Sequence, residues 1–311
     1  MATHTIEPER RTLHGHFSPD LPPALTIDPG DTVLFRTLDA GWGLGPPENP
    51  GEEPERFEPR DPEKDKGHAL CGPIEIRGAK PGMTLEVQIA KIRTGSWGWS
   101  SGGGWNNDLY KRLGVANGTP HPHWWTLSRN TMTGQDQHGQ TVALRPFLGV
   151  MGMPPPESGI HPTSPPRIWG GNLDCKELVE SSTLFLPISV PGALFSAGDG
   201  HAVQGDGEAA IVALECPLDV AELTFHLMDD MPLTTPRAHT PAGWITLGLH
   251  EDLNEAMLIA LNAMLDLMEK QYHLHRNDAL ALASLVVNLR ITQIVNGTRG
   301  VHAVLPHGAI H

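Results

Sequence analysis

Short apolar runs that alternate with polar residues dominate the first two-thirds of the chain. Segments 24–27 and 32–35 flank Pro29-Gly30, and the same arrangement returns around Pro81-Gly82. Proline presets φ and glycine accepts positive φ, so each Pro-Gly pair predicts a tight turn. Period-two alternation on both sides of the turns predicts β-strands joined by hairpin-like corners.

Two further apolar runs of strand length follow, and two other segments interrupt the pattern. Residues 183–190 and 209–215 read as strands, the second apolar enough to be buried on both faces. Segment 42–68 is rich in proline and charge, which indicates a surface loop or a lid over a site. Glycine-rich segment 95–125 either packs its aromatic rings together or forms a pocket wall. Its five tryptophans are Trp97, Trp99, Trp105, Trp124 and Trp125.

The last part of the chain changes to a helical pattern. Over residues 253–268, apolar positions recur at i, i+3 and i+4, which predicts an amphipathic helix that Asp252 caps. A second helix is expected over 278–286, and the methionine stripe of the first helix belongs to the core. We therefore divide the chain into a β-rich body, residues 1–240, and a C-terminal α/β subdomain, residues 241–311.

Amino-acid composition indicates which partners and which cellular compartment to expect. The formal net charge is -14, and an acidic surface disfavours nucleic acid and anionic membranes. Cys71, Cys175 and Cys216 form no C-x-x-C pair and predict no disulfide framework. The N-terminus has no apolar signal region, and no apolar stretch reaches the ~20 residues of a membrane helix. We expect a cytoplasmic protein without nucleic-acid or membrane partners.

The densest group of candidate ligands lies in the segment GDGHAVQGDGE. Its side chains able to bind a metal or a proton are Asp199, His201, Gln204, Asp206 and Glu208. In an extended chain Asp199 and His201 share one face, and the last three share a face as well. Carboxylates with an imidazole suit Zn²⁺, or Ca²⁺ where oxygens dominate. A Gly/Asp-rich turn between two strands is the alternative interpretation.

A second polar segment, WGGNLDCKEL, contains Asn172 and Asp174. These two either alternate onto one face of an extended chain or form Asx hydrogen bonds in a turn. Cys175 lies beside Lys176 and Glu177, a composition that suggests a Cys-Glu-Lys amidase arrangement. Adjacent residues of a strand face opposite sides, so we interpret Cys175 as a buried structural thiol.

The two segments together resemble the acetamidase/formamidase family. GGNLD matches that family's GGNxD segment, and GDGHAVQGDGE is similar to its GDxHAxQGDGE block. Asn288 departs from the family pattern, in which an acidic residue is expected at this position. Further similar segments lie in the same order along the chain, at 22–31, 186–196, 289–297 and 300–303.

This resemblance implies a mainly β fold, with a sandwich-like part and a small barrel-like part in the body and an α/β piece at the C-terminus. It also implies a metal-dependent hydrolase that cleaves the C–N bond of a small non-peptide amide, of the formamide or acetamide type, to carboxylate and ammonia. The expected metal is Zn²⁺, with Ca²⁺ as the alternative, and we expect a homo-oligomer.

Under the hydrolase function that the resemblance implies, each candidate residue has an expected role. Asp174, Asp199 and His201 are the first-choice metal ligands. Glu208 is the first choice for acid/base chemistry, with Asp206 as runner-up. The residues expected to contact substrate are His16, Asn172 and Gln204.

Two other functions remain open from the sequence. The family includes γ-lactam hydrolases, and pocket shape decides between a cyclic and a linear amide. A non-catalytic β-sandwich binding protein, with tryptophans stacked on a ligand, is the alternative from a different class. Such a module would not need the cluster of acids and histidine.

Overall fold

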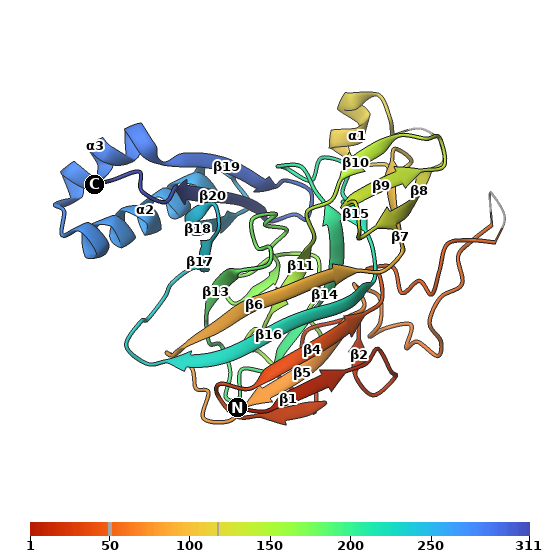
Figure 1. The fold of residues 1–311 in the computed structure, drawn as a ribbon, viewed down its shortest axis with the longest axis horizontal. Coiled ribbons are helices and arrows are strands. Elements are labelled where there is room, and N and C mark those ends of the chain that lie inside the picture. The colour runs from red at the N-terminus through yellow and green to blue at the C-terminus, as the bar shows by residue number, and fades with distance from the viewer. Residues whose placement is uncertain (49–51, 117) are drawn as a thin grey trace.

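The computed structural model describes residues 1–48, 52–116 and 118–311. The segment at 49–51, part of the expected lid or surface loop, lies outside these residues. The chain is mostly β, and two large sheets form its body (Figure 1). The mainly β fold expected from the sequence is confirmed.

The first sheet joins strands from both ends of the chain. In spatial order it consists of β1 (Thr3–Ile6), β4 (Thr32–Thr37), β16 (Leu218–Met228), β6 (Thr84–Thr94), β13 (Ser182–Pro187), β17 (Arg237–Thr240), β18 (Gly243–His250), β20 (Arg299–Leu305) and β19 (Asn288–Gln293). The long strands β6 and β16 pair along most of their length, and burial alternates along both. This alternation directs one face of the sheet into the core.

The second sheet carries the polar segments identified above. Its strand order is β10 (Thr141–Ala143), β9 (Thr133–Asp136), β8 (His121–Ser128), β7 (Trp97–Gly102), β15 (Leu214–Glu215), β14 (Phe195–Val203), β11 (Phe147–Gly152) and β12 (Gly170–Asn172). Beside β14 lies β5 (Leu70–Ile76), which also pairs with β2 (Leu13–His14) and β3 (Leu25–Ile27).

The two sheets stack face to face over one apolar core. Phe195 on β14 packs between Phe35 on β4 and Phe225 on β16, with ring centroids 6.4 and 5.1 Å apart. All three rings are fully buried. The body is thus a sandwich, as the resemblance implied, and β14 is covered on one side by the first sheet.

The Pro-Gly turns form, but they are not hairpins. Gly30 and Gly82 have φ of 93° and 94° as expected. However, β3 and β4 belong to different sheets, and so do β5 and β6. Each turn therefore carries the chain from one layer of the sandwich to the other. Local sequence defines the turn but not the sheet that the next strand joins.

One other strand prediction is wrong in part, and one segment contains elements that the sequence did not predict. Of the run 209–215, only Leu214–Glu215 is a strand, and Ile211 has φ of 68° in the preceding loop. The tryptophan-rich segment 95–125 is not loop alone. It forms β7, a short helix α1 (Asp108–Leu113) and the start of β8. Glycines and tryptophans masked the strand pattern there.

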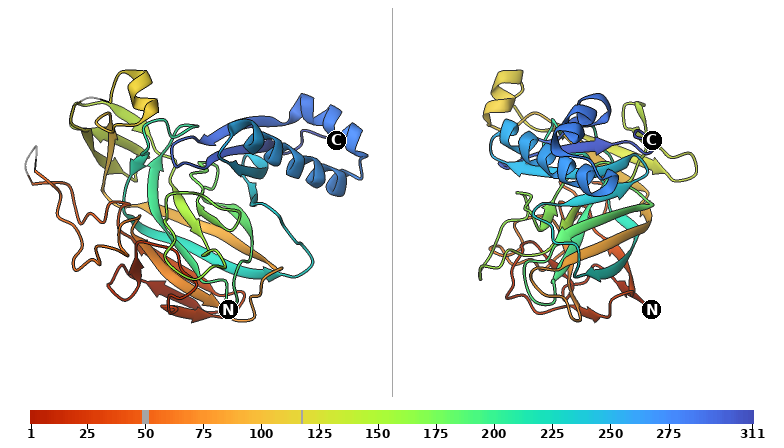
Figure 2. Two further views of the ribbon diagram at one scale, coloured as in Figure 1. Left: turned by 180° about the vertical axis from the view of Figure 1, so that it is seen from behind. Right: turned by 90° about the vertical axis from the view of Figure 1, so that its left-hand side faces the viewer.

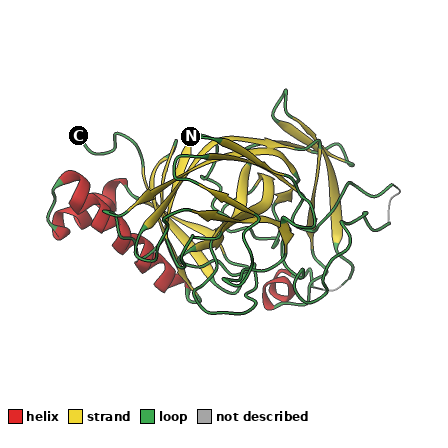
Figure 3. Cartoon of the chain, turned by 90° about the horizontal axis from the view of Figure 1, so that it is seen from below, coloured by secondary structure: helices red, strands yellow, loops and turns green. Residues whose placement is uncertain are grey.

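The C-terminal helices agree with the sequence prediction. Helix α2 (Leu253–Tyr272) begins after Asp252, whose carboxylate accepts from the backbone N–H groups of Asn254 and Glu255. Helix α3 (Arg276–Val286) follows, and both lie at one end of the molecule (Figures 2 and 3). Helix α2 packs on β18 and β20, α3 packs on α2, and the residues of both helices belong to a second apolar cluster. Among the described helices, none is both long and apolar enough to cross a bilayer.

The first sheet continues without interruption across residue 240. Strands β17 and β18 form a hairpin there and pair directly. The α/β piece expected at the C-terminus therefore extends one of the body's own sheets, while its helices bring a separate apolar cluster.

Candidate active site

The candidate active site is built around β14, which is buried along nearly its whole length. Asp199 and His201 lie two residues apart on this strand, and Glu215 on β15 pairs with His201. The His201 Nε2 atom is 3.2 Å from Asp199 Oδ1 and 3.3 Å from Glu215 Oε2. Asp174 and Glu208, from two loops, each bring a carboxylate oxygen within 4.8 Å of a nitrogen of the same ring. Four buried carboxylates thus converge on one imidazole.

The backbone bends sharply at three of these residues. Asp174, Asp199 and Glu208 have φ of 49°, 59° and 47°. Positive φ is uncommon outside glycine, and such residues cluster at functional sites. For Asp199 the bend lies inside a strand, which aims its side chain differently from regular alternation. The local geometry therefore serves the convergence of the side chains.

Gly149 on the neighbouring strand β11 leaves the space in which the side chains meet. A Cβ atom at this position would lie 2.4 Å from Asp199 Oδ2, 2.7 Å from His201 Cε1 and 2.9 Å from Asp174 Oδ1. Each separation is shorter than a Cβ contact allows. Any residue with a side chain at position 149 would therefore push the cluster apart.

The cluster carries more negative charge than its histidine can balance. Burial raises the pKa of Glu208 to about 7 and that of Glu215 to about 8. Burial and the neighbouring Glu208 raise the pKa of Asp174 well above its usual range. Burial opposes the charge on Asp199, but the attraction of His201 outweighs it and lowers the pKa of that carboxyl. In the same way Glu215 and Asp199 overcome burial and raise the pKa of His201.

Several polar atoms of this cluster are buried without a hydrogen-bond partner among the described residues. They are Asp174 Oδ1, Glu215 Oε2 and both ring nitrogens of His201. The contacts of His201 with the two carboxylates are close but lack hydrogen-bond geometry. Buried polar atoms are normally paired. Unpaired donors of imidazole and carboxylate type, with excess negative charge, fit a divalent cation.

A loop of the C-terminal part completes the site. Asn296, between β19 and β20, donates from Nδ2 to Asp174 Oδ2 at 3.1 Å and to Glu208 Oε2 at 3.5 Å. The backbone of Gly207 bonds to Thr292 O and to Ile294 N–H, which docks this loop on the Glu208 loop. A residue of the C-terminal part therefore orients two of the four carboxylates.

Of the residues expected at the site, the structure brings together Asp174, Asp199, His201 and Glu208. Asn172 lines the same cavity, with its Oδ1 atom buried and unpaired. Gln204 has a supporting position, because its Nε2 atom donates to the backbone oxygen of Asp174 at 2.8 Å.

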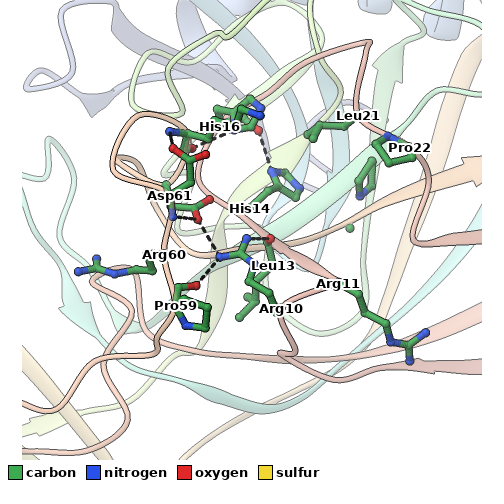
Figure 4. A pocket seen from close by; sticks show the side chains of 14 residues that line it. Arg10, Arg11, Leu13, His14, His16, Leu21, Pro22, Pro59, Arg60 and Asp61 are labelled. Carbon is green, nitrogen blue, oxygen red and sulfur yellow. Dashed lines mark hydrogen bonds and ion pairs between the residues drawn. The ribbon is translucent and has the colours of Figure 1, made fainter.

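Asp206 and His16 lie apart from the cluster. Asp206 forms an ion pair with Lys176 at 2.9 Å, and neither residue lines the cavity. His16 contacts the Lys64 carbonyl oxygen and lines a separate cavity of about 500 Å³ with His14 and Arg10 (Figure 4). The expected acid/base role of Asp206 and substrate role of His16 therefore lack support from the geometry.

Sequence reasoning did not single out Glu215, Asn296 or Gly149. Glu215 carried a signal, because it is the charged residue at the end of a run expected to be buried on both faces. A charge in such a place needs a partner. Asn296 and Gly149 carried no comparable signal, since their positions depend on loop docking and strand pairing.

A cavity of about 310 Å³ leads to the cluster. Asp199, Glu208 and Glu215 line it together with Trp42, Trp99 and Trp105. Trp99 is fixed by a hydrogen bond from its Nε1 atom to Asp39 Oδ2 at 2.7 Å. Residues of segment 42–68 also contribute to the walls. They are Trp42, Arg56, Arg60, Lys66, Gly67 and His68.

The expected pocket wall therefore forms in part. Of the tryptophans in segment 95–125, Trp99 and Trp105 line the cavity. Trp97 and Trp124 pack on each other with ring centroids 6.3 Å apart, and Trp125 donates to Ser100 Oγ. Both interpretations of these residues hold, each for different rings.

Comparison with known proteins identifies related sequences and solved structures. The model of the acetamidase/formamidase family matches residues 2–160 and 157–308. An acetamidase of Mycolicibacterium smegmatis is 29% identical over 251 residues, which cover 63% of this chain and 61% of that protein. The chain spans about 60% of the length of the curated relatives that it matches.

Solved structures share the fold. The acetamidase of Bacillus halodurans aligns with a TM-score of 0.83 at 25% identity, covering 97% of each chain. A γ-lactamase of Delftia acidovorans aligns with a TM-score of 0.65 at 20% identity, over 97% of this chain and 92% of its own, and shows the fold alone. From the match along nearly its whole length, this chain belongs to the acetamidase/formamidase family.

Proposed function

We propose that this protein hydrolyses the C–N bond of a small non-peptide amide, of the formamide or acetamide type, to a carboxylate and ammonia. The observation that supports this most is the group of four buried carboxylates around His201, three of which line a small cavity. Membership of the acetamidase/formamidase family supports the same chemistry. Because the chain matches only about 60% of the length of its curated relatives, we propose their activity for this chain on the strength of its own site.

The proposed metal ligands are Asp174, Asp199 and His201, and Glu215 adds a carboxylate beside His201. The donor set contains an imidazole, which favours Zn²⁺, and enough oxygens to make Ca²⁺ the alternative. A bound divalent cation would polarise the amide carbonyl and acidify a water molecule.

Glu208 is the proposed proton carrier. A carboxyl with a pKa near neutrality can take a proton from the attacking water and pass it to the leaving nitrogen, and burial raises the pKa of Glu208 to about 7. Asn296 holds its Oε2 atom at 3.5 Å and so orients it in the cavity. Glu215 takes the place of Asp206 as the second candidate, because it lines the cavity and Asp206 does not.

The cavity dimensions limit the substrate. A volume of about 310 Å³ with tryptophan walls admits a compact amide and excludes a folded polypeptide segment. Formamide and acetamide fit this description, and so does a small γ-lactam. A cyclic amide of this size is therefore the second candidate substrate, and pocket shape decides between the two.

We further propose a cytoplasmic homo-oligomer. The three free cysteines fit a reducing environment and so support the compartment. Leu258, Leu280 and Leu285 are exposed on α2 and α3 and offer an apolar contact surface. Light scattering after size exclusion measures the oligomeric state directly.

A substrate panel tests the proposed function. Metal-replete protein is assayed on formamide, acetamide, a γ-lactam and a peptide, with ammonia read by a coupled enzyme and ring opening by chromatography. We expect the metal-replete protein to release ammonia from a linear amide. Protein verified metal-free by elemental analysis should lose this activity, and adding Zn²⁺ or Ca²⁺ should restore it. Hydrolysis of the lactam alone favours the second candidate. Full activity without metal, or binding without turnover across the panel, contradicts the proposal.

A further inference from the structure

Three histidines gather at the β8–β9 hairpin, away from the candidate active site. His121 and His123 lie two residues apart on β8, so their side chains share one face of the strand. His138 lies in the turn between β9 and β10. The hairpin is at the upper right in Figure 1, beside α1. His121 and His138 are exposed and His123 is half-buried.

The three rings lie close to one another. The ring centroids of His121 and His123 are 5.1 Å apart, and those of His123 and His138 are 5.4 Å apart. His121 and His138 are 6.4 Å apart with nearly parallel planes. Among the described residues, neither of these two rings makes a hydrogen bond, so their nitrogens are available to a ligand.

His123 is oriented as a metal ligand usually is. Its Nδ1 atom lies 2.8 Å from Oδ2 of Asp136, a carboxylate with no exposed surface. This contact fixes the ring and leaves Nε2 directed away from the carboxylate. Metal-binding histidines commonly donate their second ring N–H to a carboxylate in this way.

The same carboxylate and the next residue hold the turn in place. Asp136 Oδ1 accepts from the backbone N–H groups of His138 and Gln140. The Gln137 side chain accepts from the N–H of Trp124 and donates to the oxygen of Pro122, on either side of His123. These bonds fasten the turn to β8 and keep His138 beside the other two rings.

From these contacts we propose that His121, His123 and His138 form a second divalent-metal site. Three imidazoles sharing one tetrahedral ion, with Zn–N bonds of ~2.0–2.1 Å, have ring centroids roughly 5 Å apart. The two pairs that include His123 meet this spacing, at 5.1 and 5.4 Å. The remaining pair must close by about 1 Å, which exposed side chains achieve by small rotamer changes.

The donor set determines the class of ion. Three neutral imidazoles without a carboxylate in the first coordination sphere favour late first-row transition metals, such as Zn²⁺, Ni²⁺ and Cu²⁺, over Ca²⁺ or Mg²⁺. This site shares no residue with the proposed catalytic cluster, so the proposal of a second metal site can be tested independently of the proposed function.

A calorimetric titration with Ni²⁺ tests the site. The wild type is compared with the double variant His121→Asn/His138→Asn, which leaves the candidate active site intact. The matched control is His273→Asn/His275→Asn, another exposed pair two residues apart. We expect the wild type and the control to bind one more Ni²⁺ than the first variant. Equal stoichiometry in all three proteins, or a loss in the control as well, overturns the proposal.

Two further measurements examine the geometry. The variant Asp136→Asn should weaken Ni²⁺ binding roughly 10–100-fold by releasing His123, with circular dichroism verifying the fold. The Cu²⁺ difference spectrum between wild type and the His121→Asn/His138→Asn variant, recorded by electron paramagnetic resonance, should show coupling to three nitrogens. Coupling to one nitrogen, together with unchanged affinity in Asp136→Asn, contradicts a three-histidine site.

Discussion

Two buried clusters in this protein combine carboxylates with histidine, and they differ in how charge is balanced. In the cavity cluster Asp174, Asp199, Glu208 and Glu215 share His201. In the second, which we call the anchor cluster, Glu177 lies 2.9 Å from Arg290 Nη1 and 3.2 Å from His302 Nε2. The anchor cluster joins the loop after β12 to strands β19 and β20.

Charge balance gives the two clusters opposite titration behaviour. Burial opposes the charge on Glu177, but His302, Lys176 and Arg290 outweigh it and lower the pKa of that carboxyl to about 2. In the cavity cluster, burial prevails and raises the pKa of both Glu208 and Glu215. A carboxylate with matching cations is a structural link, whereas carboxylates in excess are available for a cation or a proton.

The largest expected effect is in the cavity cluster. Glu208→Gln removes the proton carrier and keeps the shape of the side chain, so turnover should fall on the order of a hundredfold or more. The measurement is kcat on a linear amide, with elemental analysis to verify that the metal content is unchanged.

Asp206→Asn is the matched control for this variant. Its carboxylate pairs with Lys176 outside the cavity, so kcat should stay within a few-fold of wild type. A large loss in Asp206→Asn with little effect in Glu208→Gln would reassign the acid/base role. A loss of metal in Glu208→Gln would make Glu208 a ligand.

A substitution in the anchor cluster should change the stability of the protein. Glu177→Gln leaves Arg290 without its countercharge and His302 without its carboxylate partner, which should lower the free energy of unfolding by about 1–3 kcal/mol at pH 7. Because the folded-state pKa of Glu177 is lowered to about 2, its stabilising contribution is complete above the unfolded pKa, near 4.5, and is lost as pH falls toward 2.

Urea unfolding at several pH values measures this effect. The difference between wild type and Glu177→Gln should shrink steadily below pH 4.5, while the kcat of the folded variant stays near wild type. A difference that is constant with pH would show that the effect does not come from the ionised carboxylate.

The smallest effect is expected at Cys175, which lies between the two clusters in sequence. Burial and the nearby Glu177 raise the pKa of its thiol well above the usual range, so it is not a thiolate nucleophile. Cys175→Ala should keep kcat within a few-fold and lose only some stability from the small cavity. A loss of several orders of magnitude in a folded variant would favour covalent catalysis.

Much of the local structure was predictable, and the reasons are local. The apolar period and Asp252 located α2, and the Pro-Gly pairs located two turns. The segment around His201 showed its chemistry because five polar groups stand close in sequence. Strand pairing was not predictable, since the same turn serves a hairpin or a change of layer. This is why both Pro-Gly corners were wrongly expected to be hairpins.

The residues of the candidate site also fall into two groups, those that the sequence indicates and those that only the tertiary structure brings in. Asp199 and His201 lie two residues apart in one strand, so the sequence alone places them close together. Glu215, Asn296 and Gly149 join them only through pairing of β14 with β15, docking of the β19–β20 loop and pairing with β11.

The chain by itself determined which residue types could do chemistry and where the helices begin, because both depend on neighbours within a few residues. Tertiary structure alone decided which carboxylates are left without a balancing cation. That outcome depends on burial and on partners such as Arg290, 113 positions from Glu177 along the chain. Charge balance in a core is set by packing between distant segments, and no local pattern records it.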